Sequence, residues 1–271
     1  MKKIEFGFIQ GRMTATPSKK ILQYFPKNNW RKEFYYAKKN NFNFIEYFGE
    51  RKFNKENPIW NNKKLNEINQ LVKKNDLSNY SFCDDYFIGK NITKYKDLNK
   101  YYDKIVKNLS IINIKVYVLA LFEKSLIDKK NLNNFVKILQ TVSEKLKYRK
   151  IKLAIESNLD SELIKKLSKM VNRKNFYIVY DTGNRLKKKN LQYREILKLK
   201  KYICHIHLKD KNWRGQNVIL GKGAVNFQSI FKAIKKIKYQ GKYTFETNRG
   251  NNPIKTMCEN KSFISNLIQK S

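Results

Sequence analysis

Three consecutive segments carry the pattern that decides the fold: KVYVLAL at 115–121, LNNFVKILQTVSEKL at 132–146 and IKLAI at 151–155. The two outer segments are short and apolar, which is typical of strands that are covered on both faces. One face of the middle segment, at helical spacing, carries Phe135, Ile138, Leu139, Val142 and Leu146. A strand, a helix and a second strand in this order predict a βαβ unit with parallel strands.

The same alternation continues in both directions along the chain. The expected strands are Ile4–Gln10, Phe44–Phe48, Tyr80–Cys83, Lys115–Leu121, Ile151–Ile155, Phe176–Tyr180, Ile203–Leu208 and Tyr243–Phe245. The expected helices are Arg31–Asn40, Leu65–Asn75, Leu98–Ile112, Leu132–Leu146, Glu162–Val171, Gln192–Lys200, Gln228–Ile237 and Lys261–Ile268. In a chain of 271 residues this predicts an α/β fold, a (β/α)8 TIM barrel, as one domain over residues 1–271.

An open, doubly wound sheet is the alternative architecture. Such a sheet usually carries a GxGxxG turn after its first strand, because the glycines let the backbone approach a dinucleotide. Here the corresponding turn reads Gln10-Gly11-Arg12-Met13, which lacks that pattern. The sequence therefore favours the barrel.

The composition excludes several classes of protein. The chain has 59 Lys+Arg against 22 Asp+Glu, a net charge of +37, yet it is 41% hydrophobic and 14% aromatic, which argues against disorder. With 10 Gly and 4 Pro it is not collagen-like, and no stretch approaches the ~18 apolar residues of a membrane helix. Lysines are spread along the whole chain rather than clustered, so we expect no specific nucleic-acid or membrane partner. The positive field favours anionic small molecules instead.

The cysteines and the first residues indicate a cytoplasmic protein. Cys83, Cys204 and Cys258 are odd in number and form no CxxC pair, so we expect neither a disulfide framework nor a cysteine zinc site. The start, MKKIEFGFIQ, superficially resembles a signal peptide. Glu5 and Gln10 interrupt its apolar run, and no small-residue cleavage site follows.

Ionisable residues end several of the expected strands. Glu156, Asp181 and Glu246 each follow an apolar run directly. In a barrel these strand ends meet at one face, where isolated carboxylates are costly unless they pair or bind a cation. The two histidines of the chain, His205 and His207, share one face of their strand by alternation. The alternative is that each carboxylate only caps the helix that follows it.

These residues suggest a metal site with substrate contacts around it. Three carboxylates and the imidazole of His207 suit Mn²⁺, Mg²⁺ or Co²⁺, with Zn²⁺ as the alternative. We expect His205 one layer deeper, as a hydrogen-bonded neighbour. Arg249 is expected to grip a phosphate or carboxylate, unless it is a surface arginine, and Lys209 to reach the substrate, unless it forms a salt bridge. Glu46 and Gln10 are candidate contacts for substrate hydroxyls.

In order along the chain, seven pieces resemble the xylose-isomerase-like barrels, which include sugar phosphate isomerases and epimerases, ketose 3-epimerases, inosose dehydratases and apurinic-site endonucleases. The pieces are 7-GFIQGR-12, 44-FIE-46, 153-LAIES-157, 180-YDTGN-184, 205-HIHLKD-210, 220-LGKG-223 and 245-FETNRG-250. The resemblance implies metal ligation by Glu156, Asp181, His207 and Glu246. It also implies that the two glutamates move protons on opposite faces of the substrate. Ketose epimerases of this family place a substrate-contacting histidine three residues after the metal aspartate, and this chain has Asn184 there, so their contact pattern is only partly kept.

The expected function is therefore that of a metal-dependent sugar or sugar-phosphate isomerase or epimerase, which works through an enediolate and binds a small, anionic carbohydrate. An inosose-type dehydratase shares the first proton abstraction and is the main alternative. An apurinic-site endonuclease would need several zinc ions and many histidines, which two histidines cannot supply. A barrel kept only as a binding module, and a homo-oligomer, also stay open.

Overall fold

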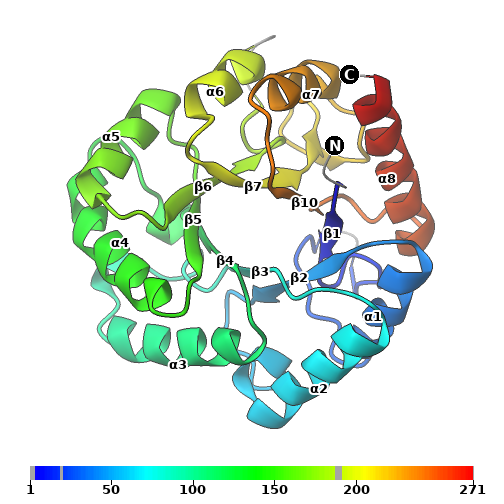
Figure 1. Cartoon of the computed structure of the whole chain (residues 1–271), viewed down its shortest axis with the longest axis horizontal. Coiled ribbons are helices and arrows are strands. Elements are labelled where there is room, and N and C mark those ends of the chain that lie inside the picture. The colour runs from blue at the N-terminus through cyan, green and yellow to red at the C-terminus, as the bar shows by residue number, and fades with distance from the viewer. Residues whose placement is uncertain (1–3, 19–20, 187–190, 271) are drawn as a thin grey trace.

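The computed structural model describes residues 4–18, 21–186 and 191–270. Its central feature is a closed barrel of parallel strands, which Figure 1 shows with the helices outside it. In order around the barrel the strands are β1 (Phe6–Ile9), β2 (Phe44–Gly49), β3 (Ser81–Asp84), β4 (Val116–Ala120), β5 (Lys152–Glu156), β6 (Phe176–Asp181), β7 (Ile203–Leu208) and β10 (Lys242–Phe245). Because β1 pairs with both β2 and β10, the sheet closes on itself, so the doubly wound alternative is wrong.

Helices follow the strands in turn and form the outer layer. They are α1 (Trp30–Lys39), α2 (Asn62–Lys74), α3 (Leu98–Ile111), α4 (Leu132–Lys147), α5 (Ser161–Val171), α6 (Leu191–Leu199), α7 (Phe227–Lys236) and α8 (Pro253–Lys270). Among the residues that the structure describes, no helix is both long and apolar enough to cross a membrane. The predicted (β/α)8 barrel is confirmed.

The amphipathic helices pack as their spacing predicts. Helix α4 buries Phe135, Leu139, Val142 and Leu146 against the barrel, with Ile138 partly buried beside them. Helix α7 begins after Asn226, whose side chain accepts a hydrogen bond from the backbone N–H of Ser229 at 2.9 Å. Such a cap satisfies one of the free N–H groups of the first turn.

Two features differ from the prediction. A small antiparallel hairpin, β8 (Asp210–Lys211) and β9 (Asn217–Val218), follows β7. Its strands are too short to produce a recognisable alternation. Helix α8 begins at Pro253 rather than near Lys261, because proline fits the first turn of a helix, where its missing N–H costs nothing.

The register of the sheet aligns the strand ends that carry polar residues. His207 pairs side by side with Asp181 on β6 and with Thr244 on β10. A register shift in β6 between Ile178 and Val179 accompanies this alignment. Residues that pair side by side in a parallel sheet point to the same face, so Asp181 and His207 both point into the barrel.

Candidate metal centre and cavity

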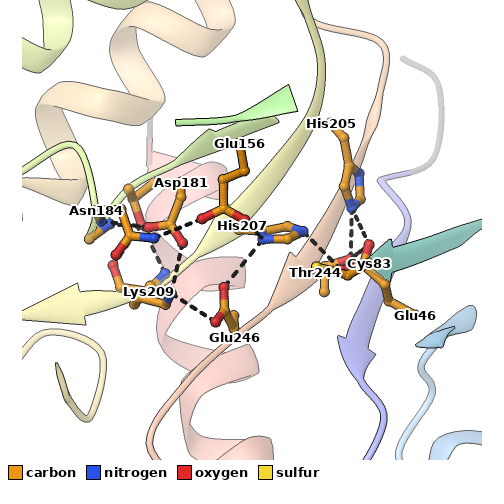
Figure 2. Close-up of polar contacts among 12 residues, drawn as sticks. Glu46, Cys83, Glu156, Asp181, Asn184, His205, His207, Lys209, Thr244 and Glu246 are labelled. Atoms are coloured by element: carbon orange, nitrogen blue, oxygen red, sulfur yellow. Dashed lines mark hydrogen bonds and ion pairs between the residues drawn. The ribbon is translucent and has the colours of Figure 1, made fainter. Parts of the chain in front are cut away.

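Four polar side chains converge at the carboxyl ends of β5, β6, β7 and β10, as Figure 2 shows. They belong to Glu156, Asp181, His207 and Glu246, and all four are buried. The Nδ1 atom of His207 lies 3.5 Å from a carboxylate oxygen of Glu156 and 3.3 Å from one of Glu246. Each residue offers one potential ligand atom, and these atoms all lie within 4.8 Å of one another.

This donor set fits a divalent cation. Three carboxylates and one imidazole are mostly hard oxygen donors, which Mg²⁺ and Mn²⁺ prefer. Carboxylates gathered in a buried space also repel one another unless a cation lies among them. A second group that could hold a metal comprises Glu46, His205 and His207. In that group both imidazoles already contact Glu46, at 2.7 Å from His205 Nε2 and 2.9 Å from His207 Nε2.

Glu46 sets the orientation of His207. Its Oε1 atom faces Nε2 of His207, which leaves Nδ1 turned toward the carboxylates of Glu156 and Glu246. A carboxylate behind a ligating histidine is the usual way in which proteins fix the ring and its tautomer. Burial lowers the pKa of His207, but Glu46 and the two other glutamates outweigh burial and raise that pKa well above its ordinary value.

Two further side chains hold the carboxylates in place. The Nζ atom of Lys209 lies 3.0 Å from Asp181 Oδ2 and 2.8 Å from Glu246 Oε1, and the Asn184 amide donates to Glu156 Oε1 at 2.7 Å. Burial raises the pKa of Asp181, and Lys209 only partly offsets this effect. For Glu246 burial acts in the same direction, but Lys209 and His207 prevail and hold its pKa below the usual range.

A cavity of about 1130 Å³ opens next to these carboxylates. Its lining includes Glu156, Glu246, Asn184 and Lys209, and its walls include loop residues 21–25 and 50–56. Pockets that hold drug-sized ligands range from about 300 to 1,000 Å³, so this space exceeds the needs of a single small sugar. The arrangement gives two carboxylates direct access to a bound molecule.

The other residues that the sequence indicated lie elsewhere. The described lining of the cavity does not include Gln10, Glu46, His205 or Arg249. Gln10 lies just past the end of β1 and is fully buried, and its amide atoms have no hydrogen-bond partner among the described residues. His205 precedes His207 on β7 and so lies one layer deeper in the barrel. It forms hydrogen bonds with Glu46 and Thr244, in agreement with the expected role of a hydrogen-bonded neighbour.

Arg249 contacts the backbone rather than the cavity. Its guanidinium donates to the carbonyl oxygens of Gly11 at 2.8 Å, Ile21 at 3.1 Å and Leu22 at 2.8 Å. Ile21 and Leu22 line the cavity, so Arg249 supports the wall of the site from behind. The expected grip of Arg249 on a phosphate or carboxylate stays a prediction, and these hydrogen bonds show the guanidinium holding backbone carbonyls.

From the sequence, Arg12 and Gln23 had no expected role, and Asp85 was a candidate substrate contact for which helix capping was the favoured alternative. Arg12 is fully buried, donates to the carbonyl of Thr247 at 3.2 Å and lies 3.6 Å from Glu246 Oε1. Gln23 also donates to Glu246 Oε1, at 3.2 Å. Asp85 lines the cavity, and burial, with help from the charges of two nearby glutamates, raises its pKa to about 8. The position of Arg12 just after β1 could have indicated it, whereas Gln23 lies on a loop that carries no such signal.

The fold resembles solved structures of sugar epimerases. A D-allulose 3-epimerase from Methylomonas sp. superposes with a TM-score of 0.75 at 16% identity, over 98% of this chain and 99% of that chain. For a 3-keto-D-glucoside 4-epimerase from E. coli the TM-score is 0.72 at 16% identity, over 97% and 100% of the two chains. The IOLI protein, described with a binding zinc atom, gives 0.71 at 14% identity, over 98% and 99%. At such identities the likeness shows the fold alone.

No curated protein sequence matches this chain. Residues 34–267 match the model of one family, and the closed barrel is the fold that this family has. The chain therefore belongs to the xylose isomerase-like TIM barrel family.

Proposed function

We propose that this protein is a divalent-metal-dependent isomerase that epimerises or isomerises a sugar or a sugar phosphate. One observation carries the proposal: Glu156 and Glu246, which flank Nδ1 of His207 at 3.5 and 3.3 Å, both line the cavity. Two carboxylates that face one bound molecule can remove a proton from carbon and return a proton from another side. The likeness to a 3-epimerase and a 4-epimerase supports this class of reaction.

The four clustered residues are our proposed metal ligands: Glu156, Asp181, His207 and Glu246. When bound, the ion would polarise the carbonyl of the substrate and stabilise the negative charge of an enediolate. We favour Mn²⁺, Mg²⁺ or Co²⁺ because the set is rich in oxygen. Zn²⁺ is the alternative, and the similar structure with a zinc atom supports it.

The two glutamates have different neighbours, which suits different roles. Arg12, which lies 3.6 Å from Glu246 Oε1, favours the ionised form of Glu246, as a proton acceptor requires. The amide of Asn184 fixes the orientation of Glu156 without adding a charge. A proton removed by one glutamate and returned by the other to the opposite face inverts that carbon, whereas return to the neighbouring carbon interconverts a ketose and an aldose.

The net charge of the chain, +37, favours an anionic carbohydrate. A positive field raises the local concentration of anions and speeds their association. The lining of the cavity itself is mixed: the basic residues are Arg51, Lys52, Lys55, Lys209 and Lys211, and the acidic ones are Glu50, Glu56, Asp85, Glu123, Glu156 and Glu246. On the charge of the whole chain we place sugar phosphates ahead of neutral ketoses. The three cysteines are free thiols, which suits a reducing compartment, and we propose the cytoplasm as the location.

The test is incorporation of solvent deuterium into a panel of ketoses and ketose phosphates, followed by NMR in the presence of Mn²⁺. We expect exchange at the carbon next to a carbonyl, and we expect a chelator to abolish it. Glu156→Gln and Glu246→Gln should each slow exchange by at least about 10²-fold, the lower range of positioned acid–base catalysis. Glu144→Gln, which changes a half-buried carboxylate on α4 that does not line the cavity, is the matched control and should exchange as fast as the wild type.

Two results would contradict the proposal. Exchange that persists in the chelator would remove the metal from the mechanism. Unchanged exchange in both glutamine variants would remove the two carboxylates from it. If water is lost from a substrate without a product epimer or isomer, the protein is a dehydratase instead.

A further inference from the structure

Lys209 occupies an unusual position for a lysine. Its side chain is 5% exposed, and its ammonium lies between Asp181 and Glu246, at 3.0 and 2.8 Å. Gly183 makes room for the aliphatic stem, because a Cβ atom at that position would lie 2.7 Å from Cγ of Lys209. The chain therefore provides a slot that directs the lysine into the carboxylate cluster.

This position conflicts with that of a metal ion. Asp181 and Glu246 belong to the proposed ligand set, whose donor atoms all lie within 4.8 Å of one another. A divalent ion held by carboxylate oxygens at about 2.0–2.2 Å would lie within a few ångströms of the ammonium. At equal distance the repulsion between charges of +1 and +2 is about twice that between unit charges, and burial strengthens it. The ammonium and the ion would therefore compete for the same carboxylate oxygens.

We infer that Lys209 is an exchangeable internal cation: its ammonium neutralises Asp181 and Glu246 until a divalent ion binds, and it then moves into the cavity. Lys209 already lines the cavity, so its ammonium can move there without disrupting the barrel. There it becomes a donor for an oxygen of the substrate. The inference rests on the proposed function only in assuming that the site takes a divalent ion.

The other cation beside Glu246 cannot play this part. The guanidinium of Arg12 donates to the carbonyl of Thr247 at 3.2 Å and to the side chain of Gln23 at 2.9 Å, and it lies 3.6 Å from Glu246 Oε1. These contacts, together with complete burial, hold Arg12 in place. Lys209 instead carries its charge on a flexible stem beside open space.

The experiment measures Mn²⁺ affinity by titration calorimetry and thermal unfolding in EDTA and in Mn²⁺. Lys209→Met keeps the length of the side chain and removes the charge. We expect this variant to unfold at a lower temperature than the wild type in EDTA, but to bind Mn²⁺ at least tenfold more tightly. Lys209→Arg keeps the charge and should show no such gain. Lys211→Met removes a neighbouring cavity charge that contacts Asn184 and should change the affinity far less.

A purely structural salt bridge predicts the opposite sign, since its loss would weaken the site for the ion as well. Equal or weaker Mn²⁺ binding by Lys209→Met would therefore overturn the inference, while leaving the proposed function intact. If neither the wild type nor any of the variants binds Mn²⁺, the proposed metal site fails as well.

A second measurement uses the unmodified protein, in case Lys209→Met does not fold. Acetylation of Lys209 by acetic anhydride is followed by mass spectrometry in EDTA and in Mg²⁺. We expect the buried amine to react several-fold faster when Mg²⁺ is present, with the rate at exposed Lys166 unchanged. An unchanged rate at Lys209 in saturating Mg²⁺ would overturn the inference.

Discussion

Replacement of Glu46 by glutamine tests how the proposed ligand His207 is held. The Glu46 carboxylate is fully buried and lies 2.7 Å from His205 Nε2 and 2.9 Å from His207 Nε2. Glutamine has nearly the same shape, but it lacks the charge. It also places an NH₂ group where one carboxylate oxygen accepts a hydrogen bond. One of the two imidazoles therefore loses its acceptor.

The magnitude follows from burial and from the position of Glu46 behind His207. Removal of one partner from a buried ion pair costs about 3–5 kcal/mol, so we expect Glu46→Gln to lower the free energy of unfolding without metal by that amount. Loss of a group that orients a ligand typically costs 10- to 100-fold in metal affinity. We therefore expect the Kd for Mn²⁺ to rise about 10- to 100-fold, which weakens the binding free energy by about 1.4–2.7 kcal/mol.

Urea unfolding in EDTA and calorimetric titration with Mn²⁺ measure the two effects. Ser81→Ala is the control, because it removes a neutral hydroxyl that donates to Glu46 but leaves the carboxylate in place. It should cost about 1 kcal/mol of stability and change Mn²⁺ affinity less than Glu46→Gln does. Wild-type stability and affinity in Glu46→Gln would refute the reasoning that Glu46 orients His207.

Three further predictions concern buried groups around the site. Burial raises the pKa of Glu33 from an ordinary 4.5 to about 7, so the folded state binds its proton more tightly than the unfolded state does. The contribution of Glu33 to stability is therefore lost as pH rises from about 4.5 to 7, by up to about 3 kcal/mol, and Glu33→Gln should reduce the stability difference between pH 5 and pH 8 in urea titrations by about that amount; an identical difference in the variant would contradict it. Gly11→Ala should cost at least about 3 kcal/mol of unfolding free energy, because φ is +88° and the new Cβ would lie 2.0 Å from the carbonyl oxygen of Tyr24; a loss below about 1 kcal/mol would show that the loop adapts. Tyr117→Phe removes a hydroxyl that donates to the buried carboxylate of Asp84 and should cost about 1.5–3 kcal/mol in the same assay, and unchanged stability would mean that the remaining donors suffice.

Much of the architecture could be predicted because the decisive patterns are local. The apolar runs at Lys115–Leu121 and Ile151–Ile155 differ from the observed β4 and β5 by one residue at each end. Alternation along Ile203–Leu208 placed His205 and His207 on one face, and the structure has both inside the barrel. The hairpin β8–β9 was missed, since two-residue strands carry no periodic signal.

The neighbours of each polar group could not be predicted in the same way. Glu46 looked like a substrate contact from the sequence, but its side chain meets two histidines that lie 159 and 161 positions further along the chain. Such contacts depend on the register of strands and on the closure of the barrel. A residue's position in the sequence does not specify either one.

By itself, then, the sequence determined a barrel with carboxylates and an imidazole at the strand ends, because side-chain alternation and helical spacing are properties of short segments. Only the tertiary structure decided which charges face one another: Lys209 between Asp181 and Glu246, and Arg12 beside Glu246. The physical reason is that closure of β1 onto β10 brings together buried groups from the two ends of the chain, and the energy of a buried charge depends on the partner it meets there.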